Sequence, residues 1–236
     1  HLRWCLHTPY AEAFALRVDG TLAGVATLTH FGGSSRVGAY CITADARIRS
    51  IDKQFIDSLI QATQAQGERP LTLQVDPAER ALWEAMGFVA EQTFQVFANG
   101  LFHEADRDEV ALLGPAQALA LLHLDRRATG EDRHALLLEH RFAAHAYVDQ
   151  GTVRGALLPM LGQGLVLAAS AEVGLELQRW LLPTQRQISV PAGNLAAKEH
   201  LVECGYGVSE RSLRLVHGKA PGLRPEMVFA WPWGAV

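Results

Sequence analysis

Glu84-Ala-Met-Gly-Phe88 and Val202-Glu-Cys-Gly-Tyr206 are two stretches that end predicted helices in the same way. Their glycines lie 118 positions apart (205 minus 87), and each glycine directly precedes an aromatic residue. Glycine readily adopts the left-handed conformation that commonly ends an α-helix. Both stretches therefore predict a helix that stops at the glycine and leads into a strand.

The starts of these two helices are also predicted to be alike. Asp76 and Asn194 are N-cap residues, whose side chains can accept a backbone hydrogen bond. Each precedes its glycine by 11 residues (87 minus 76 and 205 minus 194). Pro77 suits the first helical position, and Glu79 could reach back to complete a capping box.

The elements upstream of the two helices repeat as well. Asp19-Gly20 in the first half and Asp149-Gln150-Gly151 in the second half are typical of β-hairpin turns. A third strand, an amphipathic helix and a short strand are predicted after each hairpin, and a last strand after each capped helix. The ranges are 36–43, 51–60, 71–75 and 93–98 in the first half, and 164–168, 173–181, 187–190 and 212–216 in the second.

This order, β-β-β-α-β-α-β in each half, predicts an α+β fold in which helices cover a mixed sheet. We expect two domains, residues 1–100 and 108–236. The second half has an additional predicted strand at Glu109–Leu113, a helix that begins at Pro115, and another at Glu131–His140. The first half is therefore expected to lack its initial strand and helix, and the natural protein is expected to extend upstream of His1.

Composition excludes several classes of function. The formal charge of the 236 residues is −4 and no basic stripe is visible, which argues against nucleic-acid binding. No apolar run reaches the roughly 18 residues of a membrane span. The three cysteines are far apart without a CxxC pair, which indicates a reducing cytoplasm. The histidines form no cluster with other ligands, so no metal site is expected.

The element order, with glycine and an aromatic residue after the last helix, resembles the GNAT acyltransferase superfamily, present twice. Leu124–Arg133 (LDRRATGEDR) is similar to the LD-x-x-A-x-G-x-D-R stretch in the C-terminal domain of tandem bacterial GNAT proteins. Ser212–Gly218, before a final strand at Met227–Ala230, resembles the ending of that domain.

The resemblance implies a mechanism with acetyl-CoA as co-substrate. Acetyl-CoA would lie in a cleft where the fourth and fifth strands of the fold splay apart. A loop and a helix N-terminus would hold its pyrophosphate, since exposed N–H groups and the helix dipole favour anions. An amine would attack the thioester while a base or a water chain takes its proton, and a tyrosine on the last helix often protonates the departing thiolate.

The loop of the family reads roughly V-x-P-x-x-R-G-x-G-x-G or A, and Ile42–Asp52 takes its place here. Arg47 matches the arginine, but Ile48, Ser50 and Asp52 replace the glycines. At 4 Å and an effective dielectric near 20, repulsion between Asp52 and a phosphate is about 4 kcal/mol. We therefore expect weak CoA binding or none. The residues that the resemblance assigns to the cofactor are Ile42, Thr43, Arg47, Ile48, Arg49, Ser50 and Ile51.

Arg47 and Arg49 have an alternative interpretation as solvated residues at the start of a helix, where Asp52 would be favourable to the dipole. In the second half Ala168–Gly174 keeps one glycine and has no basic residue nearby, so this half is not expected to bind CoA. Trp83 and Leu201 stand where the tyrosine acid is expected.

Tyr40 and Cys41 lie on the strand that would line the cleft, and Tyr40 is the candidate catalytic residue. Packing is the alternative role for both. His200, one residue before the position of the missing tyrosine, is expected on the helix surface.

The sequence thus predicts an acetyl-CoA-dependent N-acetyltransferase that acts on a small-molecule or protein amine. The alternative is a catalytically inactive GNAT-fold module that binds a ligand or another protein. A third interpretation is a protein that forms a homodimer through apolar surface such as Trp231-Pro-Trp233, where packing of a C-terminal strand is the competing explanation.

Overall fold

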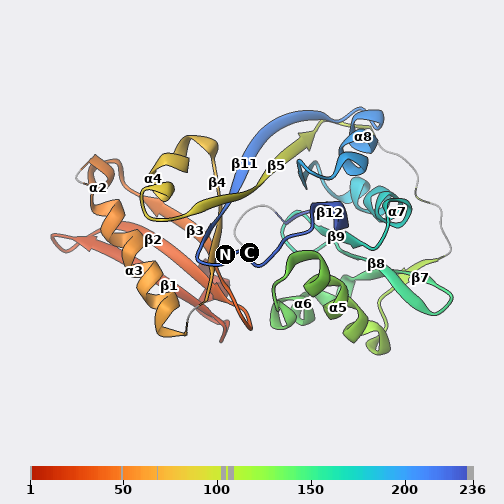
Figure 1. Cartoon of the computed structure of the whole chain (residues 1–236), viewed down its shortest axis with the longest axis horizontal. Coiled ribbons are helices and arrows are strands. Elements are labelled where there is room, and N and C mark those ends of the chain that lie inside the picture. Colours follow the sequence, from red (N-terminus) through yellow and green to blue (C-terminus); the bar gives the residue numbers. More distant parts are fainter. Residues whose placement is uncertain (1, 49, 68, 102–104, 106–108, 233–236) are drawn as a thin grey trace. The chain divides into compact units, whose positions relative to one another are not determined.

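The computed structural model describes residues 2–48, 50–67, 69–101, 105 and 109–232. Contacts divide these residues into two compact units, neither of which is a consecutive segment. Unit 1 comprises residues 2–91 and 213–221, and unit 2 comprises residues 92–212 and 222–232. Figure 1 shows the elements of both units. The predicted boundaries at 1–100 and 108–236 stay a prediction.

Unit 1 is a mixed sheet with strand order β1-β2-β3-β4-β11, in which β3 and β4 are parallel and the other pairs antiparallel. Its strands are β1 (Ala11–Val18), β2 (Thr21–His30), β3 (Ser35–Ile42), β4 (Leu71–Val75) and the last residues of β11 (Gly207–His217). Its helices are α1 (Leu2–Cys5), α2 (Ala44–Ile48), α3 (Ile51–Ala65) and α4 (Arg80–Glu84), which follows a 3-10 turn at Pro77–Glu79. The predicted hairpin is confirmed, since Asp19 and Gly20 both have left-handed φ angles (50° and 80°).

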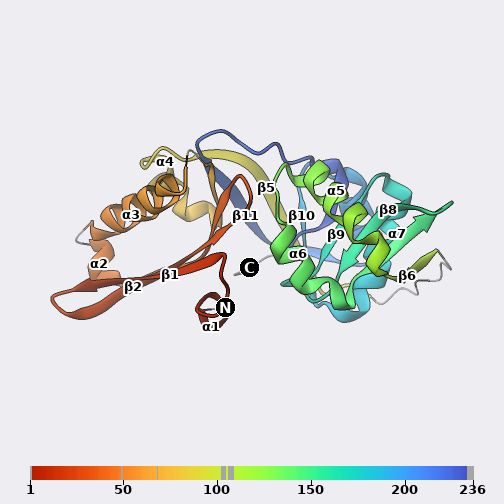
Figure 2. The same cartoon turned by 90° about the horizontal axis from the view of Figure 1, so that it is seen from below.

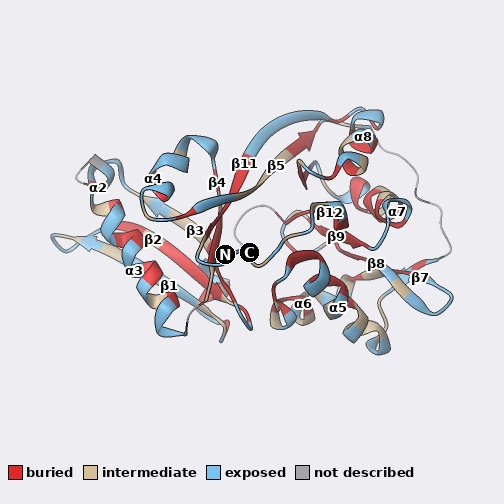
Figure 3. Cartoon of the chain, viewed as in Figure 1, coloured by how far each residue is buried: buried red, intermediate tan, exposed pale blue. Residues whose placement is uncertain are grey.

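The core of unit 1 lies between the sheet and helices α3 and α4. Figure 2 shows α3 and α4 on one side of β1 and β2 and α1 on the other. The apolar stripe predicted for residues 51–60 is the buried face of α3, and Figure 3 shows it against the buried residues of β2. This core includes Ala26, Leu28, Phe55, Ile56, Leu59, Leu73, Trp83 and Phe88.

Unit 2 is a sheet of strand order β6-β7-β8-β9-β12, with β10 joined to the end of β12 by a Ser189–Trp231 bridge and β5 paired to β10. Its strands are β6 (Val110–Leu112), β7 (His145–Asp149), β8 (Thr152–Leu158), β9 (Leu165–Ala168), β10 (Gln187–Pro191), β12 (Val228–Ala230) and most of β5 (Val89–Ala98). Its helices are α5 (Ala118–Thr129), α6 (His134–His140), α7 (Ala171–Leu181) and α8 (Leu195–Glu203).

Helices cover both faces of the unit 2 sheet. Figure 1 shows α5 and α6 across β8 and β9 from α7 and α8. α6 begins at His134, three residues later than the sequence predicts. Gly130 (φ 70°) ends α5, and the residues after it form a short connection before α6. In this connection Thr129 Oγ1 accepts a hydrogen bond from the Glu131 amide. In unit 2 the elements β6, α5 and α6 precede the β7–β8 hairpin, whereas among the described residues of unit 1 only the four-residue helix α1 precedes the β1–β2 hairpin.

The two halves of the chain exchange strands. β5 follows α4 of unit 1, yet Phe94–Ala98 pair with β10 of unit 2. β11 follows α8 of unit 2, yet Leu213–His217 pair with β4 of unit 1. Each half therefore supplies the strand that completes the sheet next to the short strand of the other half.

The predicted helix caps are confirmed in part. Asp76 Oδ1 accepts a bond from the Ala78 amide (2.7 Å), and Asn194 Oδ1 accepts one from the Ala197 amide (3.0 Å). Gly87 and Gly205 have left-handed φ angles of 86° and 78°. The capping box at Glu79 is wrong, because this carboxylate binds Arg47 instead.

Candidate active site

The candidate site begins where β3 and β4 separate. The two parallel strands pair at two positions, Ser35 with Leu71 and Arg36 with Thr72, and after these β3 pairs with β2 while β4 pairs with β11. A bulge in β3 lies next to this point. Between the Val37–Leu28 and Tyr40–Ala26 pairs, two residues of β3 lie opposite the single residue Thr27 of β2, and the Ala39 amide donates to Thr27 Oγ1 (2.8 Å). Because bulges bend strands, this one directs β3 away from β4.

Tyr40 lies after the bulge and points toward helices α3 and α4. Its ring stacks on Phe55 of α3 at 5.8 Å between centroids and meets Trp83 of α4 edge-on at 5.0 Å. Tyr40 Oη and Trp83 Nε1 are both buried and have no hydrogen-bond partner among the described residues. A buried donor without a partner costs about 1–3 kcal/mol, so these two atoms mark a place where a polar ligand group would be favourable.

The charge state of Tyr40 is fixed by its surroundings. Burial, together with the nearby carboxylates of Asp52 and Glu79, raises the pKa of Tyr40 from 10 to about 12, although Arg47 acts in the opposite direction. The phenol therefore keeps its proton at neutral pH and acts as a hydrogen-bond donor toward a ligand.

The start of α3 is where a pyrophosphate is expected from the sequence. Ser50 adopts the left-handed conformation (φ 55°, ψ 27°) and makes no side-chain cap. Asp52 is buried, and its Oδ1 accepts the Lys53 amide at 2.8 Å. Thus a carboxylate of the protein already lies at the positive end of the helix, as predicted, and Ser50 keeps the backbone shape of the glycine that it replaces.

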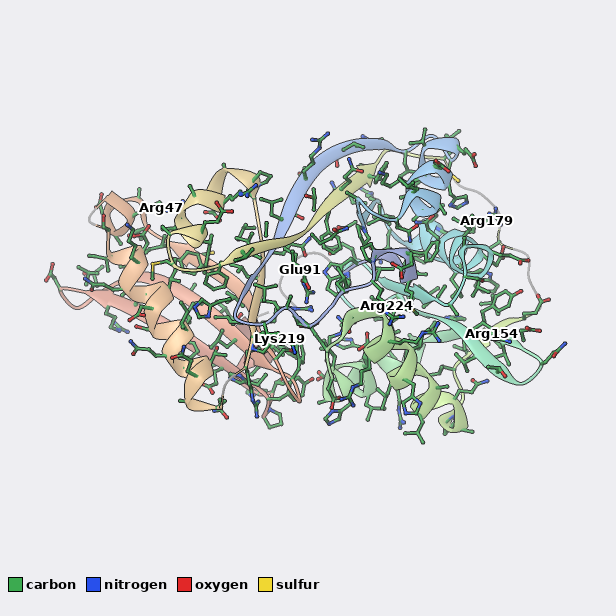
Figure 4. The ribbon with its side chains drawn as sticks, in the orientation of Figure 1. Arg47, Glu91, Arg154, Arg179, Lys219 and Arg224 are labelled. Atoms are coloured by element: carbon green, nitrogen blue, oxygen red, sulfur yellow. The ribbon has the colours of Figure 1, made fainter. Side chains whose placement is uncertain are left out.

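Arg47 is paired with a carboxylate. Its Nη2 lies 3.1 Å from Glu79 Oε1, and both side chains are partly exposed. Figure 4 shows Arg47 on α2. The pair connects the segment after β3 with the turn after β4. To bind a phosphate, Arg47 would have to break its ion pair with Glu79 or contact both groups at once.

The other residues assigned to the cofactor follow the same segment. Ile42 and Thr43, at the end of β3, line a shallow depression of about 260 Å³ together with Cys41 and residues 22–25. Ile48 is in α2 and Ile51 begins α3. Arg49 lies outside the described residues.

The corresponding place in unit 2 is occupied by the C-terminal strand of the chain. β12 pairs with β9 on one side, Val228 with Leu167 and Ala230 with Val166. On the other side the Trp231 amide donates to the Ser189 oxygen of β10 (2.8 Å). The sequence predicted the strand but not its position between β9 and β10.

His200 is not on the helix surface, and that prediction is wrong. It is buried on α8, its Nδ1 lies 2.6 Å from Gln178 Oε1, and its Nε2 lies 3.5 Å from Cys204 Sγ. α8 directs His200 toward α7, where it meets Gln178. The similarity between the two capped helices gives no information about which side of α8 is buried. Burial raises the pKa of the Cys204 thiol, so Cys204 is a poor nucleophile at neutral pH.

Among the described residues, histidine, cysteine and carboxylate side chains form no group of three or more that could hold a metal ion. Within the same residues, the helices are too short or too polar to cross a membrane.

Solved structures with a similar fold include proteins that are named as acetyltransferases. A provisionally named acetyltransferase from Pyrococcus horikoshii has a TM-score of 0.80 and 15% identity, over 94% of this chain and 79% of that protein. A GCN5-related N-acetyltransferase from Sphaerobacter thermophilus has a TM-score of 0.57 and 16% identity, over 92% and 83%. A tandem GNAT protein from the clavulanic acid biosynthesis pathway has a TM-score of 0.54 and 14% identity, over 92% and 85%.

No model of a protein family and no curated protein matches the chain. The architecture confirms the predicted α+β class with helices over a mixed sheet. The chain has the fold of the GNAT acetyltransferases.

Proposed function

We propose that unit 1 binds an acyl-CoA, with acetyl-CoA as the expected co-substrate, and transfers the acyl group to an amine. The observation that carries this proposal is the separation of β3 from β4 after two paired residues, next to the bulge at Ala39. Such a separation leaves backbone groups of both strands free to bind the amides of pantetheine. Tyr40 and Trp83 add two buried donors at the same place.

The proposed acyl transfer uses the amine, the thioester and a hydrogen-bond donor that unit 1 supplies. The amine nitrogen attacks the thioester carbonyl, the C–S bond breaks, and the proton lost by the nitrogen ends on the sulfur directly or through water. A thiol has a pKa near 8.5, well below that of Tyr40. Tyr40 is therefore proposed to stabilise the departing thiolate by donating a hydrogen bond while keeping its proton.

A second candidate function is a GNAT-fold module without catalysis, which binds a ligand or a protein. The buried Asp52 carboxylate at the start of α3 favours this candidate, because it repels the pyrophosphate of CoA. The Arg47–Glu79 pair favours it too, since it engages the basic residue that matches the family arginine.

Thermal unfolding with millimolar acetyl-CoA separates the two candidates. A ligand at 100 times its Kd adds about 2.7 kcal/mol of stability, which raises Tm by roughly 5–10 °C for a chain of this size. Asp52→Asn keeps the acceptor for the Lys53 amide and removes the charge, so it should enlarge the shift. Arg47→Ala should reduce it.

Arg154→Ala is the matched control, since Arg154 is a half-exposed arginine of unit 2 whose Nε lies 3.7 Å from Asp149 Oδ2. Its shift should equal that of the wild type. The absence of a shift in the wild type and in Asp52→Asn would reject acyl-CoA binding and leave the non-catalytic module.

A further inference from the structure

The Leu124–Arg133 motif lies beside the C-terminal strand of unit 2. Asp125 and Arg133 are buried and form a two-bond ion pair, in which Arg133 Nε is 3.2 Å from Asp125 Oδ2 and Arg133 Nη2 also binds Asp125 Oδ1. Gly130 ends α5 in the left-handed conformation, so the chain can turn back and bring the arginine to the aspartate. The guanidinium carbon of Arg133 is 4.9 Å from the centre of the Trp231 ring.

The two helices on the other side of β12 bind its backbone through side chains. Gln178 Nε2 of α7 donates to the Phe229 oxygen (2.7 Å), and Asn194 Nδ2 at the start of α8 donates to the Val228 oxygen (2.9 Å). Because the Gln178 amide donates to β12, its oxygen is left to accept from His200 Nδ1. His200 therefore fixes the orientation of Gln178.

The side chain of Phe229 occupies the space above Gly174. A Cβ atom on Gly174 would lie 2.3 Å from two carbons of the Phe229 ring, closer than any real contact. Gly174 is the one glycine that this half keeps in the place of the cofactor loop. Because Gly174 has no side chain, it leaves room for the ring of Phe229.

We propose that Met227–Trp231 is a resident ligand strand, which fills the gap between β9 and β10 where the fold would otherwise accept an extended ligand. The motif residues Asp125 and Arg133, with Gln178 and Asn194, form the clamp that holds this strand. Pantetheine is a chain with two amide groups, and the backbone of β12 offers the same groups to the strand edges. The inference concerns unit 2 and does not depend on the function proposed for unit 1.

Hydrogen exchange measured by mass spectrometry on the full chain tests whether β12 is seated in the gap between β9 and β10. Gly174→Ala adds a methyl group against Phe229 and leaves the Asp125–Arg133 pair untouched. We expect exchange in residues 225–232 to become about tenfold faster or more, while exchange in β7 and β8 stays close to that of the wild type, because local opening is measured segment by segment.

Gly155→Ala is the matched control, because the atoms that its added Cβ would contact do not belong to β12. These atoms are side-chain carbons of Leu177 and Val173 at 2.6 Å and the Leu167 oxygen at 3.1 Å. It should not accelerate residues 225–232 selectively. If Gly174→Ala does not fold, Trp231→Leu takes its place, since it keeps an apolar side chain and removes the ring over Arg133. Unchanged exchange in residues 225–232, or an equal increase in β8, would overturn the proposal.

Discussion

Tyr40, Ser50 and Asp52 are the residues of unit 1 on which the proposed binding of acyl-CoA depends most. Tyr40 provides a buried donor without a partner among the described residues. Ser50 keeps the left-handed backbone of a phosphate loop without its glycine. Asp52 places a carboxylate at the helix start. The resemblance to the family loop points to Ser50 and Asp52 by spacing, and Tyr40 was a candidate because of its strand. Their part in ligand binding stays a prediction.

Tyr40→Phe tests the environment of the phenol. The folded protein favours the neutral form, because the pKa of Tyr40 is raised from 10 to about 12. This contribution to stability is complete below pH 10 and is lost as the pH rises toward 12. The free energy of unfolding of the wild type should fall more steeply over this interval than that of Tyr40→Phe.

The check is a series of urea unfolding curves at stepwise pH, with tyrosinate absorbance recorded in parallel. Tyr40→Phe should also remove one absorbance component that titrates near pH 12. Parallel stability curves for the two proteins would show that Tyr40 titrates normally and is exposed.

Ser50→Gly should stabilise the protein. A left-handed φ costs a non-glycine residue about 1–2 kcal/mol, and the added chain entropy of glycine offsets about 0.5–1 kcal/mol of the gain. The exposed Ser50 side chain makes no cap bond that would be lost. We expect a net gain of about 0.5–1 kcal/mol, measured by urea unfolding.

Ser58→Gly is the control in the same helix, where the φ angle is that of an ordinary helical residue. It should destabilise the protein by about 0.5 kcal/mol. If Ser50→Gly lowers the free energy of unfolding as much as Ser58→Gly does, Ser50 carries no backbone strain.

At the scale of elements, the caps and turns were predictable because each depends on a few neighbouring residues. Asp19-Gly20, Asp76 and Asn194 act as the sequence indicates. The predicted capping box at Glu79 is wrong, because Arg47, 32 positions away, binds the Glu79 carboxylate.

The position of β12 and the exchange of β5 and β11 depend on pairing between distant segments. The repeat contains no information about such pairing. A buried strand is recognisable in Met227–Ala230, but its partners are not.

The two N-caps should differ in their contribution to stability. Asp76→Ala removes one exposed cap bond and should cost about 0.5–1 kcal/mol. Asn194→Ala removes a buried cap and leaves the Val228 oxygen without its side-chain donor, so we expect about 2–4 kcal/mol. Urea unfolding of both variants measures the difference. Equal losses would contradict the contact between Asn194 and β12.

At the scale of the whole molecule, the strand exchange makes the two halves of the chain depend on each other. A fragment of residues 1–100 has β4 without its β11 neighbour, and a fragment of residues 108–236 has β10 without β5. Both fragments would expose strand edges, which favour association.

We expect each fragment alone to be unfolded or aggregated and the mixture to give a one-to-one complex with native circular dichroism. Size-exclusion chromatography with light scattering measures the association. Two fragments that fold as independent monomers would show that the exchanged strands are dispensable.

The central claim is that one of the two units binds acyl-CoA and the other is closed by its own strand. Isothermal titration of the full chain with acetyl-CoA tests it most directly, because the method counts sites. We predict one site per chain, weakened by Arg47→Ala and tightened by Asp52→Asn. Two sites per chain, or one site that is unchanged in both variants, would contradict the claim.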